Sequence, residues 1–464
     1  MPADAISEAP QSGRSTAPFR KVLVANRGAV AARVIRAVHA LGCKAVAVHS
    51  DADAGAPYLE EADEVIRIGP APARESYLNQ DALLEAATKA GADALHPGYG
   101  FLSENEAFAA RTAAMGITFI GPSPRHIGAM GEKTRARMVM AENGFPVAAG
   151  SGLLPADPDE VLRAARAIGF PVMVKPAGGG GGIGMAVARD EASLLRTVER
   201  ARAAAERSFA DGGVYLERFL ERARHVEVQV LGDRHGQVRH LFERDCSIQR
   251  RHQKVIEEAP APNLARGPAA DIAQRAAEAL QRLGYDNIGT VEMLMGEDGS
   301  FGFLEVNTRL QVEHAVTEMV TGLDLVAAQI RAAAGEALDR ILPPRIDVEG
   351  HAVEARIYAE DPRRFIPSPG RLTRFRLPRG NADWRIETGY REGMEVTPFY
   401  DPLLAKAVVR GRSREEAIRG LRELLAAVEI EGPKTNIPFL LAVLDDPRFQ
   451  AGEVHTGLAA EIRV

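Results

Sequence analysis

One stretch of sequence decides the centre of the fold: Val172-Met173-Val174-Lys175-Pro176-Ala177, then glycine at 178–182, Ile183 and Gly184. Its apolar beginning predicts a short buried strand, with Lys175 at the strand's end. Successive glycines free the backbone N–H groups to converge on an anion, and the lysine adds a fixed positive charge. A flexible linker is the alternative, but linkers rarely follow a buried strand directly. The stretch therefore predicts a loop that covers phosphate groups.

This loop matches neither of the common nucleotide-binding signatures. A P-loop requires Gly-x-x-x-x-Gly-Lys-Ser/Thr, and the segment Gly131-Glu132-Lys133-Thr134 has the wrong order. The dinucleotide fingerprint requires several glycines after the first strand, where this chain has only Gly28. The sequence therefore predicts a phosphate site of another type.

A second feature predicts a metal site. Two apolar segments flank Asp298-Gly299, a favoured two-residue hairpin turn. If these residues form the turn, Glu292 lies directly opposite Glu305, and like charges so placed destabilise a sheet unless they are neutralised. With Asn307 on the same face, two carboxylates and an amide oxygen suit Mg²⁺ or Mn²⁺. A solvated acidic face is the alternative, but the phosphate loop favours the metal.

Polar residues continue to alternate with apolar ones after this hairpin, at Glu305, Asn307, Arg309, Gln311 and Glu313. An extended segment would place all five polar side chains on one side. Arg309 is suited to clamp a planar anion, and Glu313 is placed to act as a general base. A surface strand would also alternate, but it would more often carry lysines and serines.

The densest polar run of the chain spans residues 243–254, ERDCSIQRRHQK. It places three cations beside one histidine, at Arg250, Arg251, Lys254 and His252. Such a run is typical of a basic surface loop, but it also suits a pocket for phosphate or carbonate. The residues alone favour neither interpretation.

The order of apolar segments predicts an α/β protein of several parts. Short strands separated by helical patterns are expected at 21–26, 44–49, 92–96 and 117–120, which indicates a parallel, Rossmann-like α/β domain. Strands then dominate from residue 214 to 306, and a helix-rich piece follows. After His351 strands return and a helix is expected around 415–428, which indicates a C-terminal α+β domain.

The bulk composition excludes several classes of protein. With 464 residues the chain exceeds one ordinary core, and its net charge of −6 argues against a general nucleic-acid or membrane surface. No apolar run approaches the ~20 residues that span a bilayer. Cys43 and Cys246 are too few for a disulfide framework and indicate a reduced, cytoplasmic protein. Residues 1–18 resemble no targeting signal and predict a disordered tail.

Several longer segments together carry a family resemblance. They are ANRG at 25–28, HPGYGFLSEN at 96–105, the glycine loop, the run at 243–254, the row at 305–314 and KTN at 434–436. Over nearly the whole chain after the tail, they resemble the biotin carboxylases, members of the ATP-grasp group. The resemblance implies an N-terminal domain over 19–131, an ATP-grasp domain over 132–350 with a lid at about 147–220, and a C-terminal domain over 351–464.

The resemblance also implies roles at matching positions. The implied ATP-binding residues are Lys133, Lys175, Gly181, Gly182, Glu217, Arg218, Phe219, Leu220, His225, His252, Glu292 and Glu305. Glu292, Glu305 and Asn307 match the metal ligands, in agreement with the hairpin argument. The implied bicarbonate residues are Lys254, Arg309, Gln311, Val312 and Glu313, and Tyr99 and Arg356 match positions near biotin. Lys254, Arg309, Glu313 and Arg356 are the expected catalytic residues.

Simpler roles stay open for some of these positions. Tyr99 and His96 would also suit a purely structural role in their glycine-rich loop. His225 is equally consistent with a hydrogen-bonded structural residue, and Arg356 with an ion-pair partner.

The activity implied by the resemblance is carboxylation of biotin with ATP and bicarbonate, through carboxyphosphate. This is the first half-reaction of a biotin-dependent acyl-CoA carboxylase, as in fatty acid biosynthesis. No Met-Lys pair occurs in the chain, so we expect biotin on a separate carrier protein and a separate carboxyltransferase. We also expect a homodimer, and neither nucleic acid nor membrane as a partner. The final acceptor, such as acetyl-CoA, propionyl-CoA or pyruvate, stays open.

One position departs from the family pattern. Ile183 stands where family members usually carry Arg or Lys, and an apolar side chain cannot pair with phosphate. This departure keeps open a nucleotide-binding subunit with weakened catalysis. Independently of Ile183, another ATP-grasp ligase that joins a carboxylate to an amine also stays open. The row at 305–313 and Arg356 favour the biotin carboxylase over the second alternative.

Overall fold

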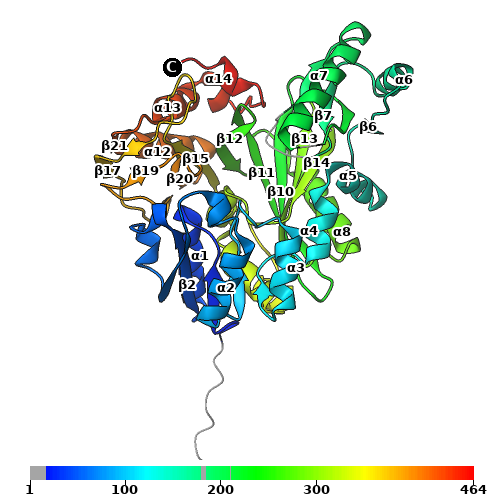
Figure 1. The fold of residues 1–464 in the computed structure, drawn as a ribbon. Helices are drawn as coiled ribbons and strands as arrows, with labels where there is room; N and C mark the ends of the chain where they lie inside the picture. The colour runs from blue at the N-terminus through cyan, green and yellow to red at the C-terminus, as the bar shows by residue number, and fades with distance from the viewer. Residues whose placement is uncertain (1–16, 179–183, 210) are drawn as a thin grey trace, which may run out of the picture.

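The computed structural model describes residues 17–178, 184–209 and 211–464. Most of the predicted tail, together with Gly181, Gly182 and Ile183 of the predicted lid loop, lies outside these residues. Figure 1 shows the N-terminal region in blue below the C-terminal region in orange and red, with the green strands of a large sheet beside both. A smaller lobe carrying α6 (Pro158–Ile168) and α7 (Glu191–Phe209) projects away from the N-terminal region.

The N-terminal region is the predicted parallel α/β domain. Its five parallel strands lie in the order β3-β2-β1-β4-β5 and are covered by helices that include α1 (Gly28–Ala40), α2 (Gln80–Ala90) and α3 (Glu106–Ala114). The strands are β1 (Lys21–Val24), β2 (Lys44–Ser50), β3 (Glu64–Gly69), β4 (Ala94–His96) and β5 (Thr118–Phe119). The strand order reverses between β1 and β4, and ligands of such sheets bind beyond the carboxyl ends at that point. Asn26 follows β1 there, and its amide donates to the carbonyl of Tyr99, which follows β4, at 2.8 Å.

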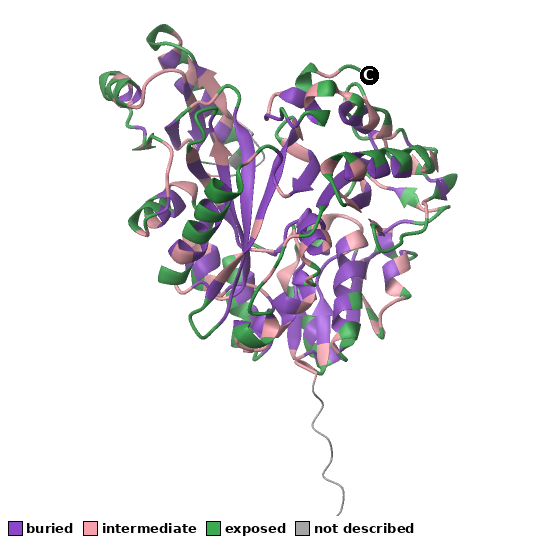
Figure 2. Ribbon diagram, turned by 180° about the vertical axis from the view of Figure 1, so that it is seen from behind, coloured by how far each residue is buried: buried purple, intermediate pink, exposed green. Residues whose placement is uncertain are grey.

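A large antiparallel sheet joins the central and C-terminal regions. Its order is β14-β13-β10-β11-β12-β15-β20-β18, so the sheet passes without interruption across the expected domain boundary at 350. The strands are β10 (Arg224–Gly232), β11 (Val238–Arg250), β12 (Gln253–Ala259), β13 (Ile288–Met295), β14 (Phe301–Asn307), β15 (His351–Tyr358), β18 (Trp384–Thr388) and β20 (Leu403–Gly411). Figure 2 shows these strands buried along most of their length.

The polar run at 243–254 is not a surface loop. It forms the end of β11 and the start of β12, which pair with each other and turn at Arg251 and His252. Glu243, Arg244 and Asp245 are buried. The loop interpretation was wrong because the strand buries its charged groups against partners from distant segments, and those partners are invisible in a local pattern.

The hairpin of β13 and β14 has the predicted pairing but not the predicted turn. Glu292 lies opposite Glu305, as expected. The loop, however, has three residues at 297–299, between Gly296 and Ser300, which are joined by a 2.9 Å hydrogen bond. Gly299 takes the left-handed conformation that such loops favour, with φ of +77°. An extra residue at Leu304 forms a β-bulge that restores the register beyond it.

The alternating polar row does not form one extended strand. β14 ends at Asn307, and the chain continues irregularly until α9 (His314–Thr321) begins. The expectation of a strand as far as Glu313 was therefore wrong. The side chains are gathered by contacts between them rather than by strand geometry.

The projecting lobe contains its own small sheet. Its order is β6-β9-β7-β8, and the strands are β6 (Gly150–Leu153), β7 (Val172–Pro176), β8 (Ala186–Ala188) and β9 (Val214–Arg218). α6 and α7 pack on this sheet around Val161, Leu194 and Val198. Lys175 thus stands near the end of a buried strand, as predicted, directly before the glycine loop.

Helices complete the remaining regions. In the central region they are α4 (Pro124–Gly131), α5 (Lys133–Glu142), α8 (Arg266–Arg282), α10 (Leu325–Ala333) and α11 (Leu338–Ile341). The C-terminal region adds α12 (Arg414–Ala426), α13 (Ile437–Asp445), α14 (Pro447–Gln450) and α15 (Leu458–Glu461), with short strands β16 (Gly370–Arg371), β17 (Arg374–Arg376), β19 (Glu395–Val396) and β21 (Glu429–Glu431). Both cysteines are free and buried. No helix in the described part of the chain is both long and apolar enough to cross a membrane.

Candidate active site

Two adjoining cavities lie where the three regions meet. The sheet cavity, of about 360 Å³, lies between the large sheet and the projecting lobe, and it is lined among others by Lys133, Lys175, Glu292 and Glu305. The N-terminal cavity, of about 350 Å³, lies beyond the carboxyl ends of β1 and β4. Four residues line both cavities and form a shared wall: Gln253, Arg309, Val312 and Arg356.

Most of the predicted site residues line the sheet cavity. They are Lys133, Lys175, Glu217, Arg218, Phe219, Leu220, His225, His252, Lys254, Glu292, Glu305, Asn307, Arg309, Gln311, Val312 and Arg356. Tyr99 lines the N-terminal cavity instead. Glu313 is fully buried behind the wall, where it contacts Lys254 and Arg356. Tertiary packing thus brings together residues that are spread over most of the chain.

A row of three glutamates crosses the sheet beside the cavity. Glu227 on β10 lies opposite Glu292 on β13, which in turn lies opposite Glu305 on β14. Lys254 from β12 places its ammonium 2.6 Å from Glu227 and 2.7 Å from Glu292. This cation offsets part of the repulsion that three aligned carboxylates would otherwise produce.

Lys254 also contacts a third carboxylate. Its ammonium lies 2.6 Å from Glu313, so three glutamates share one lysine. Burial opposes the charge of Lys254, but these carboxylates outweigh it and raise the lysine's pKa well above its usual range. In the same way burial opposes ionisation of Glu292, but Lys254 and His225 lower its pKa. Lys254 and Glu292 are therefore ionised groups that hold each other.

The two predicted phosphate lysines pair with different carboxylates. Lys133 lies at the start of α5, 3.2 Å from Glu305. Lys175 donates to Glu217 at 2.6 Å, and Arg137 contacts the other oxygen of that carboxylate at 2.6 Å. Both lysines line the cavity, so each is available to a polyphosphate that competes with its carboxylate.

Arg309 is held as a fork at the shared wall. Its Nε donates to Glu104 at 2.7 Å, and its two terminal nitrogens donate to Asn307 at 2.8 Å and Gln311 at 3.0 Å. Two of these partners belong to the predicted polar row. A guanidinium fixed in this way is suited to bind a small planar anion with two oxygens.

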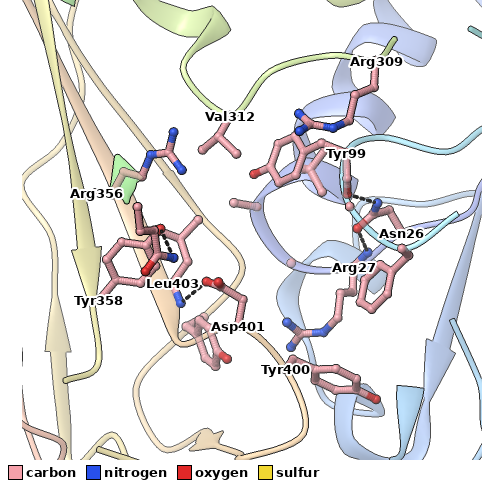
Figure 3. A pocket seen from close by; sticks show the side chains of 17 residues that line it. Asn26, Arg27, Tyr99, Arg309, Val312, Arg356, Tyr358, Tyr400, Asp401 and Leu403 are labelled. Atoms are coloured by element: carbon pink, nitrogen blue, oxygen red, sulfur yellow. Dashed lines mark hydrogen bonds between the residues drawn. The ribbon is translucent and has the colours of Figure 1, made fainter. Parts of the chain in front are cut away.

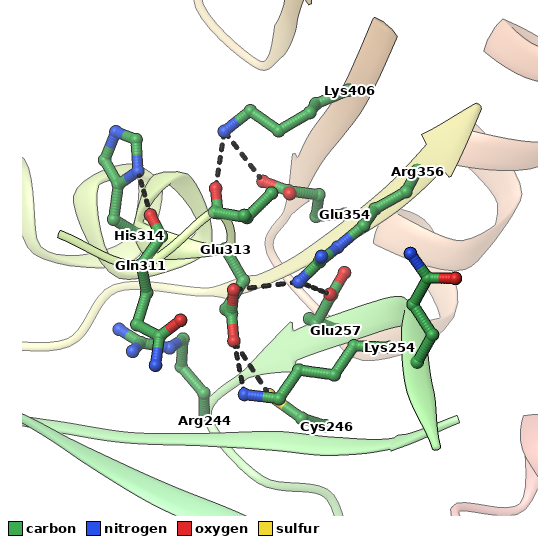
Figure 4. Close-up of polar contacts among 12 residues, drawn as sticks. Arg244, Cys246, Lys254, Glu257, Gln311, Glu313, His314, Glu354, Arg356 and Lys406 are labelled. Carbon is green, nitrogen blue, oxygen red and sulfur yellow. Dashed lines mark hydrogen bonds and ion pairs between the residues drawn. The ribbon is translucent and has the colours of Figure 1, made fainter. Parts of the chain in front are cut away.

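Arg356 is held between two buried carboxylates, as Figure 4 shows. One terminal nitrogen lies 2.9 Å from Glu313 and 2.5 Å from Glu257. Burial opposes ionisation of Glu313, but Lys254, Arg356 and Arg244 hold its pKa well below its usual range. Glu313 is therefore a carboxylate that can accept a proton, although these cations weaken it as a base.

The residues present suit a divalent cation. Glu292 and Glu305 supply carboxylate oxygens across one hairpin, and Asn307 on the same strand as Glu305 supplies an amide. Three buried carboxylates surround the ammonium of Lys254, and Arg244 and Arg356 pair with two of them, Glu227 and Glu313. Among described residues, two groups have atoms close enough to share an ion: His225, Glu227 and Glu292, and Glu227, Cys246 and Glu313. Glu305 belongs to neither group and pairs with Lys133.

The N-terminal cavity combines aromatic rings with arginines, as Figure 3 shows. Tyr99 lies beside Arg309, with Val312 between it and Arg356, and burial raises the pKa of Tyr99 to about 12. At the opposite side Arg27 stacks on Tyr400 at 4.2 Å. This environment suits a neutral ring system with polar edges better than a phosphate.

Sequence reasoning missed three glutamates of this site. Glu104 lies within the quoted segment at 96–105, but nothing local indicated that it would hold Arg309. Glu227 had a visible signal, since the segment VEVQV at 226–230 places acid and amide groups inside an apolar strand. Glu257 had none, because its role depends on Arg356, which is distant in sequence.

Known proteins resemble the chain along nearly its whole length. Residues 18–127 match the family "Biotin carboxylase, N-terminal domain", residues 132–341 match "Carbamoyl-phosphate synthase L chain, ATP binding domain", and residues 354–461 match "Biotin carboxylase C-terminal domain". The biotin carboxylase of Halalkalibacterium halodurans is 50% identical over 438 residues, which cover 94% of this chain and 96% of that protein.

Solved structures share the fold. The biotin carboxylase of Campylobacter jejuni, in a complex described as β-γ-ATP, has a TM-score of 0.91 and 42% identity, covering 96% of this chain and 99% of that one. The biotin carboxylase domain dimer of the Hydrogenobacter thermophilus 2-oxoglutarate carboxylase contains MgADP, ADP and bicarbonate. It has a TM-score of 0.90 and 43% identity, covering 96% of this chain and 97% of that one. With this identity along nearly its full length, the chain belongs to the biotin carboxylase family of ATP-grasp enzymes.

Proposed function

We propose that this protein carboxylates biotin with ATP and bicarbonate. The observation that carries the proposal is the shared wall between the two cavities. Lys133 and Lys175 line one cavity, aromatic residues line the other, and Arg309, Val312 and Arg356 belong to both. A reaction that activates bicarbonate with ATP and passes the carbon to biotin needs two such compartments that meet at one point.

The sheet cavity is the proposed ATP site. Lys133 and Lys175 would exchange their present carboxylate partners for phosphate oxygens, which carry more charge. Residues 217–220 and His252 line the same cavity and would contact the nucleotide away from the phosphates. Glu292, Glu305 and Asn307 would hold Mg²⁺ or Mn²⁺, and a bound ion would neutralise charge on the transferred phosphate.

Bicarbonate is proposed to bind at Arg309 and Lys254. Arg309 is already oriented by Glu104, Asn307 and Gln311, so little ordering is required when an anion arrives. We infer a route through carboxyphosphate in which Glu313 accepts the bicarbonate proton. An anion bound near Lys254 would offset part of the positive charge around Glu313 and so raise its basicity.

Biotin is proposed to bind in the N-terminal cavity with its ureido ring near Tyr99 and Arg356. Carboxyphosphate would break down to carbon dioxide and phosphate, and the freed phosphate would take the proton from N1 of biotin. Arg356 lies in the shared wall, where its charge would stabilise the resulting enolate while N1 attacks the carbon dioxide. A closing lid would exclude water from the labile intermediate.

We propose that biotin arrives on a separate carrier protein and that a separate carboxyltransferase uses the product. A homodimer is the proposed assembly, and the solved dimer of the Hydrogenobacter thermophilus domain supports it. The acceptor that finally receives the carboxyl group is not indicated by residues of this chain, since both cavities serve only the biotin half-reaction.

The test is ATP hydrolysis that depends on both bicarbonate and free biotin. Arg309→Ala should lower this activity roughly 100-fold, because it removes the positioned donors for the anion. Arg331→Ala is the matched control, since Arg331 is also ion-paired, with Glu336 at 2.7 Å, but lies outside both cavities. Full activity in Arg309→Ala, or ATP hydrolysis whose rate does not depend on biotin, would contradict the proposal.

A further inference from the structure

Two buried glutamates face each other behind the shared wall. Glu257 on β12 lies directly opposite Glu354 on β15, and both side chains are 0% exposed. Within the described part of the chain, no side chain makes a well-aligned hydrogen bond to any oxygen of either carboxylate, although Arg356 forms an ion pair with Glu257 at 2.5 Å. Like charges opposite each other in a dry sheet are strongly disfavoured, so this pair requires an explanation.

The nearby cations do not neutralise both carboxylates. Arg356 contacts Glu257 at 2.5 Å, but the same nitrogen also contacts the ionised Glu313 at 2.9 Å. Lys406 lies 2.8 Å from Glu387 and 3.8 Å from Glu354. Each cation therefore already has another carboxylate partner.

The partners of these cations are firmly ionised. Burial opposes ionisation of Glu387, but Lys406 and Arg385 hold its pKa well below its usual range. For Glu257 and Glu354 the balance is reversed, because burial raises the pKa of both above the usual range despite Arg356 and Lys406. The charged and titratable groups that face the pair are Lys254, Glu313, Arg356, Lys406, Glu387, Tyr99, Tyr358 and Cys246.

We propose that Glu257 and Glu354 share one proton and together position Arg356 for biotin. This inference rests on the proposed function and deepens it. With one proton the pair carries a single negative charge, which fixes Arg356 against β12 while its guanidinium stays available to the cavities. Loss of that proton would add a second negative charge and draw the guanidinium away from the ring.

Glu354 is also connected to the shared wall through Lys406. Lys406 donates to the backbone carbonyl of Val312 at 2.5 Å, and Glu354 is one of the carboxylates near that lysine, as Figure 4 shows. Ionisation of Glu354 would compete with Val312 for Lys406. The displacement of Arg356 and the loss of the hydrogen bond from Lys406 to Val312 would both loosen the shared wall beside the proposed bicarbonate site.

The kinetic test uses two variants and their pH profiles. Glu354→Gln cannot lose a proton, so the alkaline decline of kcat should move upward by about one pH unit, a tenfold change in proton concentration. Glu257→Gln removes one anchor of Arg356, so kcat/KM for biotin should fall about tenfold while KM for ATP stays within about twofold. If the two glutamates had a purely structural role, the variants would not shift the pH profile of kcat. Nor would they lower kcat/KM for biotin selectively while leaving KM for ATP unchanged.

Glu258→Gln is the matched control. Glu258 is the neighbouring residue on the same strand and is equally buried, but it pairs with Arg414 at 2.7 Å and His351 at 2.8 Å. This variant should lose stability without changing the pH profile. The proposal is overturned if Glu257→Gln and Glu258→Gln have the same kinetic profile, or if Glu354→Gln keeps the wild-type alkaline decline.

A spectroscopic readout is independent of biotin turnover. The infrared spectrum of the wild type at pH 7 should contain the carbonyl stretch of a protonated carboxylic acid that disappears in Glu354→Gln and remains in Glu258→Gln. If Glu354→Gln does not fold, loss of the band in Glu257→Gln serves instead. If the wild type lacks this band, the two glutamates share no proton, and this inference fails whatever the enzyme's activity. If the band is present but the protein does not carboxylate biotin, the proposed function fails while the shared proton stands.

Discussion

Glu292 and Glu305 lie directly opposite each other on two antiparallel strands, yet each is neutralised by a different lysine. Lys254 contacts Glu292 at 2.7 Å, and Lys133 contacts Glu305 at 3.2 Å. The negative charge of each carboxylate is thus offset by a separate lysine. We expect a cation bound between them to replace these contacts, which would release Lys133 toward phosphate and Lys254 toward bicarbonate.

Removal of either carboxylate should therefore weaken metal binding. We expect Glu292→Gln and Glu305→Gln each to lower the affinity for Mn²⁺ in the presence of ADP by at least about tenfold, since each removes one hard oxygen ligand. Titration followed by electron paramagnetic resonance measures this directly. Glu297→Gln on the exposed loop of the same hairpin is the control and should bind Mn²⁺ as the wild type does. Unchanged Mn²⁺ affinity in both site variants would exclude this metal site.

Loss of Glu217 should destabilise the projecting lobe. Its carboxylate is buried between Lys175 and Arg137, so Glu217→Ala leaves two buried cations without their partner. Breaking a buried pair in this way costs about 3 kcal/mol. Thermal unfolding should show a lower midpoint for Glu217→Ala, and little change for Glu221→Ala, whose pair with Arg189 is exposed. Equal midpoints for the two variants would contradict the argument.

The contribution of Glu258 to stability should depend on pH. Burial opposes its ionisation, but His351 and Arg414 lower its pKa below the usual value of 4.5. The folded state then binds fewer protons than the unfolded state as the pH falls below that value, so this stabilisation is present at neutral pH and lost in acid. The stability difference between wild type and Glu258→Gln, measured in urea, should shrink below about pH 4.5. A difference that grows in acid would contradict this sign.

Restoring a cation at position 183 should strengthen ATP binding. Ile183 lies outside the described residues, so the expectation comes from the sequence, where an apolar residue replaces the usual Arg or Lys. One charge-assisted hydrogen bond contributes about 1.5 kcal/mol, so Ile183→Arg should lower KM for ATP roughly tenfold. Ile183→Leu is the control and should behave like the wild type. A large gain in turnover with Ile183→Arg would indicate that the natural chain has weakened catalysis.

The proposed assembly predicts a dimer in solution. Light scattering at micromolar concentration should give twice the mass of the 464-residue chain. A monomeric mass under these conditions would refute the homodimer.

The pairing of Glu292 with Glu305 was predictable from sequence, although the turn assumed in that prediction was wrong. The expected two-residue turn at Asp298-Gly299 aligns Glu292 with Glu305. The real loop has one more residue, and the bulge at Leu304 compensates for it. A single bulge does not change the pattern of apolar residues recognisably, so its position could not be predicted from the sequence.

By itself the sequence determined the local elements: the strand that carries Lys175 to the glycine loop, the parallel N-terminal domain and the family. These follow from periodicity and short motifs, which act between residues close in the chain. Only the tertiary structure decided which charges meet. Arg309 and Glu104 are 205 positions apart, and Glu257 and Glu354 meet only because β12 and β15 pair. Such contacts depend on how separate segments pack, and no local pattern contains that information.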